Sequence, residues 1–167
     1  GCFSRPGKCV KRKAMTLALD DRLRADFVVE GNWPIVVRHR VRWSEVDAYA
    51  HVNHTSYLEW YEDMRIRAMA EVGLELAADL PGPVLAKIEV EYHRPLHYRD
   101  EVLIGARVTG FRTSSLTMTY GTWKMGEGQV NRANALCVMF VNTTGMKAAV
   151  PEAAKPIWRE RHGAKGA

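Results

Sequence analysis

The chain alternates between two hydrophobic periods, and their order predicts its secondary structure. Residues 35–43 repeat at every second position, with apolar side chains and His39 on one face and three arginines on the other. A period of two is that of a β-strand with one buried face. Residues 57–72 repeat at spacings of three and four, which predicts an amphipathic helix. Its apolar stripe consists of Tyr57, Tyr61, Met64, Ala68 and Val72.

Four further segments with strand character follow this helix, joined by short turns. They cover residues 84–92, 101–111, 114–123 and 129–141. Consecutive strands with short turns pair mostly antiparallel. One helix must then bury its stripe on one face of the sheet, so the predicted fold class is α+β.

Three regions organise the chain. Residues 1–14 are basic and without apolar periodicity, and we expect a disordered extension there. Residues 15–34 read as a loose lead-in with at most one helical turn. Residues 35–167 form the folded domain.

In the first strand after the helix, Val84, Ala86, Ile88, Val90 and Tyr92 are expected on one face. Beyond residue 142, Pro151 and Pro156 argue against a long helix.

Composition excludes several function classes. The net charge of +5 equals the five basic residues of segment 1–14, so the rest of the chain is neutral and gives no sign of nucleic-acid binding. No run approaches 18 apolar residues, so no membrane span is expected. With no secretion signal and an odd count of three cysteines, we expect a cytoplasmic protein. Cys137 is expected to be a small buried hydrophobe, and no metal or cofactor is expected.

The start of the helix offers several capping residues. Ser56 followed by Glu59 fits a capping box, and Asn53 and Thr55 are rival caps. Gly73 is expected to end the helix. Trp60 and Ile66 fall off the stripe, which favours an oligomer contact. Arg65 lies on the stripe and needs a partner such as Glu62.

Between the first strand and the helix, the stretch "VRWSEVDAYAHVNHTSYLEWYEDMR" places Asp47, His51 and Asn53 within seven residues. It resembles the hot-dog-fold acyl-CoA thioesterases of the 4-hydroxybenzoyl-CoA thioesterase type. The later "EYHRPLHYRDEV" resembles the junction of that family's second and third strands. Together the resemblance covers roughly residues 35–145. His54 departs from the pattern, because many relatives carry a second Asn there.

The resemblance implies a curved antiparallel sheet around one helix, a homodimer or homotetramer, and an active site between protomers. It makes Asp47 the catalytic carboxylate and the helix N-terminus the site that faces the thioester carbonyl. Hydrolysis needs a carboxylate base or nucleophile and donors for the oxyanion. Residues 52–56 are expected to offer unpaired N–H groups at a positive helix end. No cofactor or metal is needed.

The predicted substrate is therefore the thioester of an acyl-CoA or an acyl carrier protein, and the predicted site has two parts. The catalytic residues are Asp47, His51 and Asn53. The substrate-binding residues are Val52, His54, Thr55, Ser56 and Tyr57. Some roles stay open. His51 either assists proton transfer or bonds the loop backbone, Asn53 orients the loop or caps the helix, and Tyr57 also fits a core position. Glu45 is expected on the same strand face as Asp47.

Two other functions remain possible on these residues. Hot-dog hydratases of enoyl thioesters use an Asp and a His a few residues apart, and Asp47 with His51 imitates that pair. A non-catalytic acyl-thioester binding protein needs the same pocket. Release of free thiol from acyl-CoA separates hydrolysis from both.

Overall fold

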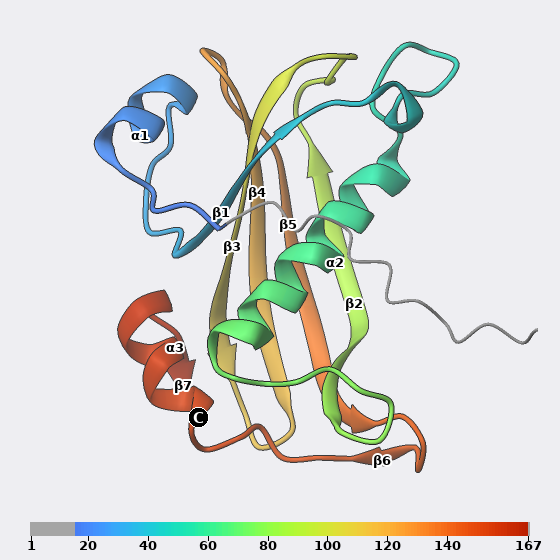
Figure 1. The fold of residues 1–167 in the computed structure, drawn as a ribbon, viewed down its shortest axis with the longest axis vertical. Coiled ribbons are helices and arrows are strands. Elements are labelled where there is room, and N and C mark those ends of the chain that lie inside the picture. The colour runs from blue at the N-terminus through green and yellow to red at the C-terminus, as the bar shows by residue number, and fades with distance from the viewer. Residues whose placement is uncertain (1–15, 167) are drawn as a thin grey trace, which may run out of the picture.

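A curled antiparallel sheet wrapped around one long helix is the main feature of the computed structural model, which describes residues 16–166 (Figure 1). The five main strands lie in the order β1-β3-β4-β5-β2, and each neighbouring pair is antiparallel. These strands are β1 (Ile35–Arg40), β2 (Pro81–Tyr92), β3 (Glu101–Phe111), β4 (Ser115–Lys124) and β5 (Gly128–Val141). The helix is α2 (His54–Glu71). The predicted α+β class is confirmed. Residues 1–14, expected to be a disordered extension, lie outside the described residues.

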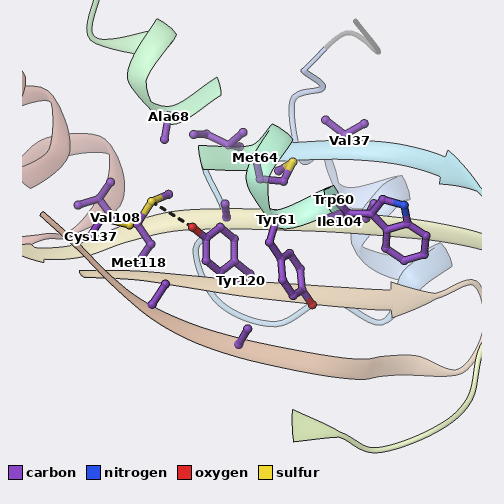
Figure 2. Packing of buried hydrophobic residues seen from close by; sticks show 14 of the residues in the cluster. Val37, Trp60, Tyr61, Met64, Ala68, Ile104, Val108, Met118, Tyr120 and Cys137 are labelled. Carbon is purple, nitrogen blue, oxygen red and sulfur yellow. Dashed lines mark hydrogen bonds between the residues drawn. The ribbon is translucent and has the colours of Figure 1, made fainter. Parts of the chain in front are cut away.

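Helix α2 buries its predicted stripe in the concave side of the sheet. Tyr61, Met64 and Ala68 are each at most 1% exposed, and the Tyr61 ring stacks on Tyr120 of β4 at 4.8 Å between centroids (Figure 2). Trp60, which falls off the stripe, is also buried and packs against His39 of β1. Because the sheet curls around the helix, its contact face is wider than one stripe, and Trp60 needs no oligomer contact to be covered.

Both ends of α2 have identifiable caps. The Asn53 side chain accepts the Thr55 N–H at 3.0 Å, so Asn53 is the N-cap. Ser56 lies inside the helix and is buried there, so the capping box proposed for Ser56 and Glu59 is wrong. At the other end Gly73 has a φ of +73°, a left-handed conformation that only glycine adopts at little cost. The predicted end of the helix is confirmed.

The first strand is shorter than its pattern predicts, and its outer face is covered at Val36 while Arg38 and Arg40 on that face are exposed. It ends at Arg40, and the 3₁₀ turn η1 (Trp43–Glu45) follows, in which the Trp43 side chain is 75% exposed. Val36, on the face away from α2, is fully buried. The segment before β1 covers it, because α1 (Asp21–Phe27) and the residues after it pack there. Residues 15–34 were expected to be a loose lead-in with at most one helical turn; the described part of that segment contains a short helix, α1, and is packed on the sheet rather than loose.

Strand β2 contains an irregularity that changes which side chains face the core. Its register against β5 shifts between Leu85 and Lys87, so Leu85 lies opposite the buried Cys137 and Val84 lies opposite Val138. The inner face of β2 therefore carries Leu85, Ile88, Val90 and Tyr92. The predicted alternation from Val84 through Ala86 is wrong, because a bulge moves every residue before it to the other face.

The C-terminal region contains a helix that the pattern did not predict. Helix α3 (Ala154–His162) includes Pro156 in its first turn, where backbone N–H groups have no helical acceptor and proline costs little. His162 in its last turn is buried; its Nδ1 accepts the Val108 N–H at 2.9 Å, and its Nε2 lies 2.6 Å from Glu71 Oε2. These contacts fasten α3 to the sheet and to the end of α2. Two short strands, β6 (Met146–Lys147) and β7 (Lys165–Gly166), complete the sheet.

Candidate active site

The segment before α2 forms a tight hairpin that delivers the chain into the helix. Val46 and Val52 form an antiparallel bridge. On either side of it the Asp47 N–H donates to the His51 carbonyl at 2.8 Å and the Asn53 N–H donates to the Glu45 carbonyl at 2.8 Å. Because Asn53 is also the N-cap of α2, the hairpin and the helix share one rigid junction. The sequence motif is thus a structural unit and not an open loop.

Asp47 stands at the base of the hairpin turn with its carboxylate only partly engaged. It is half-buried, and its Oδ1 accepts the Tyr49 N–H at 2.8 Å. Its other carboxylate oxygen, Oδ2, has no hydrogen-bond partner among residues 16–166. One oxygen is therefore held in place while the other is open to a water molecule or a substrate. That arrangement suits a carboxylate that acts as a base or as a nucleophile.

The helix N-terminus offers fewer free donors than the sequence predicts. Of the five amides between residues 52 and 56, four already donate to an acceptor within the chain. The four bonds are Val52 N–H to the Leu96 carbonyl, Asn53 N–H to the Glu45 carbonyl, Thr55 N–H to Asn53 Oδ1 and Ser56 N–H to the Asn53 carbonyl. Among the described residues, only the His54 N–H in this stretch lacks an acceptor. A developing oxyanion at the helix mouth would therefore find one free amide, that of His54.

The Glu45 side chain is mostly buried and holds the hairpin to its neighbours. Its carboxylate lies 2.8 Å from His39 Nε2 and accepts the Arg42 N–H at 2.7 Å and the Trp60 indole N–H at 3.0 Å. Burial raises the pKa of Glu45, but these hydrogen bonds outweigh burial and hold the pKa below its ordinary value. Glu45 lies in the 3₁₀ turn, so the expectation that it shares a strand face with Asp47 is wrong.

The two histidines of the motif differ in their surroundings. The His51 side chain is exposed and lies edge-on to the His97 ring at 5.1 Å between centroids, while its carbonyl closes the hairpin against Asp47. His51 thus bonds the loop through its main chain. His54 is exposed at the first position of α2. Thr55 is exposed beside it and donates its hydroxyl to Asn53.

Aromatic side chains surround the helix mouth. Tyr57 is buried against Trp60, as expected for a core residue, and its ring also lies edge-on to Tyr92 of β2 at 5.4 Å. Burial, with the nearby Tyr92 and Asp100, raises the pKa of Tyr57, so its hydroxyl stays protonated. Trp43 and Tyr98 are exposed and in edge contact at 5.6 Å. The mouth thus combines a polar hairpin with an apolar rim.

Sequence reasoning missed the segment that supports the hairpin from outside. The connection between β2 and β3, residues 93–100, places the Leu96 carbonyl against the Val52 N–H and buries the Leu96 side chain completely. The sequence marked this segment only as a junction between two strands, through its resemblance to the thioesterase family. An apolar residue between Pro95 and His97 in a polar connection was the available signal, but nothing in the pattern shows which distant amide it will meet.

Other candidate chemistry is absent from the described residues or is inert. Between residues 16 and 166 no group of three or more His, Cys, Asp or Glu side chains could hold a metal ion. No helix in that range is long and apolar enough to cross a membrane. Cys137 is fully buried, and burial raises the pKa of its thiol, so the expectation of a buried hydrophobe is confirmed.

Comparison with known proteins decides the family. The family model described as "Thioesterase-like superfamily" matches residues 41–156, which is most of the chain and includes the hairpin and all of α2. The chain belongs to the thioesterase-like superfamily. Its curled antiparallel sheet around one helix is the hot-dog fold, as the sequence resemblance implied. The finer assignment to the 4-hydroxybenzoyl-CoA thioesterase type stays a prediction.

Individual members of this superfamily resemble the chain at modest identity. The acyl-CoA thioester hydrolase YbgC of Escherichia coli O157:H7 is 29% identical over 109 residues, which cover 64% of this chain and 78% of that protein. A thioesterase-superfamily structure from Jannaschia sp. CCS1 superposes with a TM-score of 0.78 at 28% identity, covering 87% of this chain and 94% of that one. A thioesterase from Thermus thermophilus, solved with coenzyme A and zinc, has a TM-score of 0.66 at 28% identity over 80% of this chain and 98% of that one.

Proposed function

We propose that this protein hydrolyses acyl thioesters of coenzyme A or of an acyl carrier protein, with Asp47 as the reacting carboxylate and the His54 N–H as oxyanion donor. One observation carries the proposal. Asp47 keeps a free oxygen and His54 keeps a free amide, and these two groups lie on opposite arms of one hydrogen-bonded hairpin. Membership of the thioesterase-like superfamily supports the reaction class.

The geometry is compatible with two routes. In the base route Asp47 takes a proton from water as the water oxygen bonds to the thioester carbon, and the carbonyl electrons move to an oxyanion at the His54 N–H. The intermediate then collapses, the C–S bond breaks, and the proton leaves with sulfur as a free thiol. In the nucleophile route the carboxylate oxygen itself bonds to the carbonyl carbon and expels the thiolate, and water then hydrolyses the mixed anhydride.

The remaining residues of the predicted site have supporting roles in this proposal. Asn53 caps the helix and thereby uses the amide of Thr55, which leaves the His54 amide as the free donor. Val52 and Ser56 are buried and anchor the junction, and Tyr57 forms the apolar wall behind it. His51 shapes the hairpin through its carbonyl.

We also propose that the active unit is a homodimer or homotetramer. Strand β2 has 12 residues and, among the described residues, pairs only with β5, so its other edge is open. A long open edge with Leu85 and Tyr92 38% and 50% exposed invites pairing with a second copy.

The test is release of free thiol from a panel of acyl-CoA and acyl carrier protein thioesters. Asp47→Asn keeps the size of the side chain and removes its charge, so kcat should fall about 10²-fold or more. KM should change less, because the carboxylate acts mainly in the transition state. Asp21→Asn, an exposed aspartate on α1, is the matched control and should leave both constants unchanged.

Two outcomes would redirect the assignment. If Asp47→Asn keeps more than about a third of wild-type kcat while His51→Ala abolishes turnover, the reacting group is His51, and hydration of an enoyl-CoA becomes the reaction to measure. If the wild-type protein releases no thiol from any thioester but binds acyl-CoA, the protein is a binding module and not a hydrolase.

A further inference from the structure

A cavity of about 370 Å³ lies beside α2 at the end remote from the hairpin. It is an open depression bordered by the second half of α2, the first residues of β2 and the loop that joins them, and its apolar wall includes Ile66, Leu76 and Pro83. Among the described residues that line it, Arg65 is the only cation. The carboxylate of Glu62 is the other charged group of the lining. A mostly apolar cavity with a few charged groups is the usual form of a site that orients a small ligand.

Arg65 is nearly buried and weakly paired. Its side chain is 11% exposed, and the nearest carboxylate oxygen, Glu62 Oε1, lies 3.5 Å from its Nη2, beyond the usual N–H···O distance. Glu62 is 63% exposed, so water screens this pair. On its other side the guanidinium hydrogen-bonds the Tyr120 hydroxyl; burial raises the pKa of that phenol, and the charge and hydrogen bond of Arg65 oppose the rise. This phenol occupies only part of the donor capacity of the guanidinium. A guanidinium has five N–H donors, and burying it without matching acceptors is costly.

Apolar side chains of β2 lie between this cavity and the helix mouth. At one end Tyr57 in the first turn of α2 contacts Tyr92 of β2, and at the other end Ile66 and Pro83 line the cavity together. Helix α2 and strand β2 therefore run alongside each other in opposite directions (Figure 1). Between the two ends the inner face of β2 presents Leu85, which is 38% exposed, and the half-buried Ile88 and Val90.

The distance between the helix mouth and the cavity sets the size of the ligand. His54 and Arg65 are separated by 11 residues, which corresponds to about 16 Å along a helix. Helical side chains lean toward the N-terminus, so the Arg65 guanidinium lies closer to the helix mouth than its Cα, on the order of 10 Å away. A saturated acyl chain of medium length spans such a distance.

We propose that Arg65 selects acyl groups that carry a terminal carboxylate, with the thioester at the Asp47 hairpin, the methylene chain against the inner face of β2, and the carboxylate on the Arg65 guanidinium. This proposal rests on the proposed hydrolase function and names its substrate class, the mono-thioesters of medium-chain dicarboxylic acids. A carboxylate matches the planar fork of arginine and would supply the acceptors that Glu62 does not.

The direct test compares substrates that differ only at the distal end. Suberoyl-CoA and octanoyl-CoA have the same chain length and end in a carboxylate and a methyl group. The wild-type protein should hydrolyse suberoyl-CoA with a kcat/KM at least tenfold higher than octanoyl-CoA. Succinyl-CoA is too short to reach Arg65 and should have no such advantage over butyryl-CoA. Equal or lower kcat/KM for suberoyl-CoA would overturn the proposal without any variant.

Three variants assign the preference to Arg65. Arg65→Met keeps the apolar stem and removes the charge, so the suberoyl-to-octanoyl ratio should fall at least tenfold. Arg65→Lys keeps the charge without the fork and should retain an intermediate ratio. Glu62→Gln removes the competing carboxylate and should raise the ratio. An unchanged ratio in Arg65→Met overturns the proposal. If Arg65→Met does not fold, the suberoyl-to-octanoyl ratios of Arg65→Lys and Glu62→Gln test the proposal in its place. Wild-type ratios in both variants would then overturn it.

A binding measurement separates this inference from the hydrolase function. Thioether analogues of CoA that carry an octyl or a 7-carboxyheptyl chain cannot be hydrolysed, and calorimetry of the wild-type protein measures their affinities. Tighter binding of the carboxylate-ended analogue supports the Arg65 site even if no thioester is cleaved. If the protein releases thiol from octanoyl-CoA but binds both analogues equally, the hydrolase function is supported and the Arg65 proposal is overturned.

Discussion

Asp47 and His51 are joined across the base of the hairpin that precedes α2 by a hydrogen bond from the Asp47 amide to the His51 carbonyl, at 2.8 Å. The bond uses the main chain of both residues, so their side chains are left for other tasks. The Asp47 carboxylate turns back onto the Tyr49 amide, while the His51 ring lies against His97. The spacing of four residues between Asp47 and His51 suggested an acid–base pair of side chains. In the structure the same spacing lets the two main chains close a turn.

Removing the free amide at the helix mouth should abolish most of the activity while leaving the helix intact. His54 is the first residue of α2, a position that tolerates proline, and Asn53 has φ −61° and ψ 139°, which suits a residue before proline. His54→Pro should therefore fold normally but lose about 10²–10³-fold in kcat, the usual cost of one oxyanion donor.

His54→Ala is the matched control for that variant, because it removes the imidazole and keeps the amide. Thiol-release kinetics should show nearly wild-type kcat for His54→Ala, and circular dichroism should show the same helix content for both variants. A large loss in His54→Ala with little in His54→Pro would move the role from the amide to the ring.

Glu45→Gln should reduce stability more than catalysis. The Glu45 carboxylate is 12% exposed and binds three donors, so the variant should lose about 1–3 kcal/mol of unfolding free energy at pH 7. Its effect on kcat should be milder than that of Asp47→Asn. Denaturant unfolding followed by tryptophan fluorescence measures the loss.

The same residue predicts a pH dependence of stability. The pKa of Glu45 in the folded protein lies below its ordinary value of 4.5, so its contribution is fully present above that value and is lost as the pH falls through the lower, folded pKa. Wild-type protein should therefore lose more unfolding free energy between pH 6 and pH 3 than Glu45→Gln does. Parallel slopes for the two proteins would contradict the role given to this carboxylate.

Ala50→Gly should stabilise the protein. Ala50 ends the hairpin turn with a φ of +62°, a left-handed conformation that costs a non-glycine residue about 1–2 kcal/mol. Glycine relieves that strain but loses more entropy on folding, so a net gain of about 0.5–1 kcal/mol is expected. Calorimetric melting should show a small rise in Tm with kcat unchanged; a fall in kcat would show that the turn needs the stiffness of alanine.

The open edge of β2 predicts self-association. Light scattering at micromolar concentration should give at least twice the chain mass of 18.9 kDa. Leu85→Lys should weaken the dimer, because it places a charge on the partly exposed inner face of β2. It is a gentler variant than Ile88→Pro, which would remove a backbone N–H and disturb β2 itself. A wild-type monomer would contradict the proposed assembly.

The sequence by itself determined the elements that rest on a repeating local pattern. The stripe of α2, the end of that helix at Gly73 and the order of the later strands follow from periodicity, because a helix or strand that buries one face must repeat its apolar side chains at its own period. The motif around Asp47 was also visible, since its residues are close along the chain.

Only the tertiary structure decided which groups of that motif are free to act. The Val52 amide is occupied because Leu96, 44 positions later, brings its carbonyl against it, and the Glu45 carboxylate is occupied by hydrogen bonds with His39 and Trp60. The bulge in β2 and the burial of Val36 on the outer face of β1 arise in the same way, from neighbours distant in sequence. Periodicity reports what a residue does within its own element, whereas hydrogen bonds between elements depend on how the whole chain closes. The single free amide of His54 is therefore a property of the fold and not of the motif.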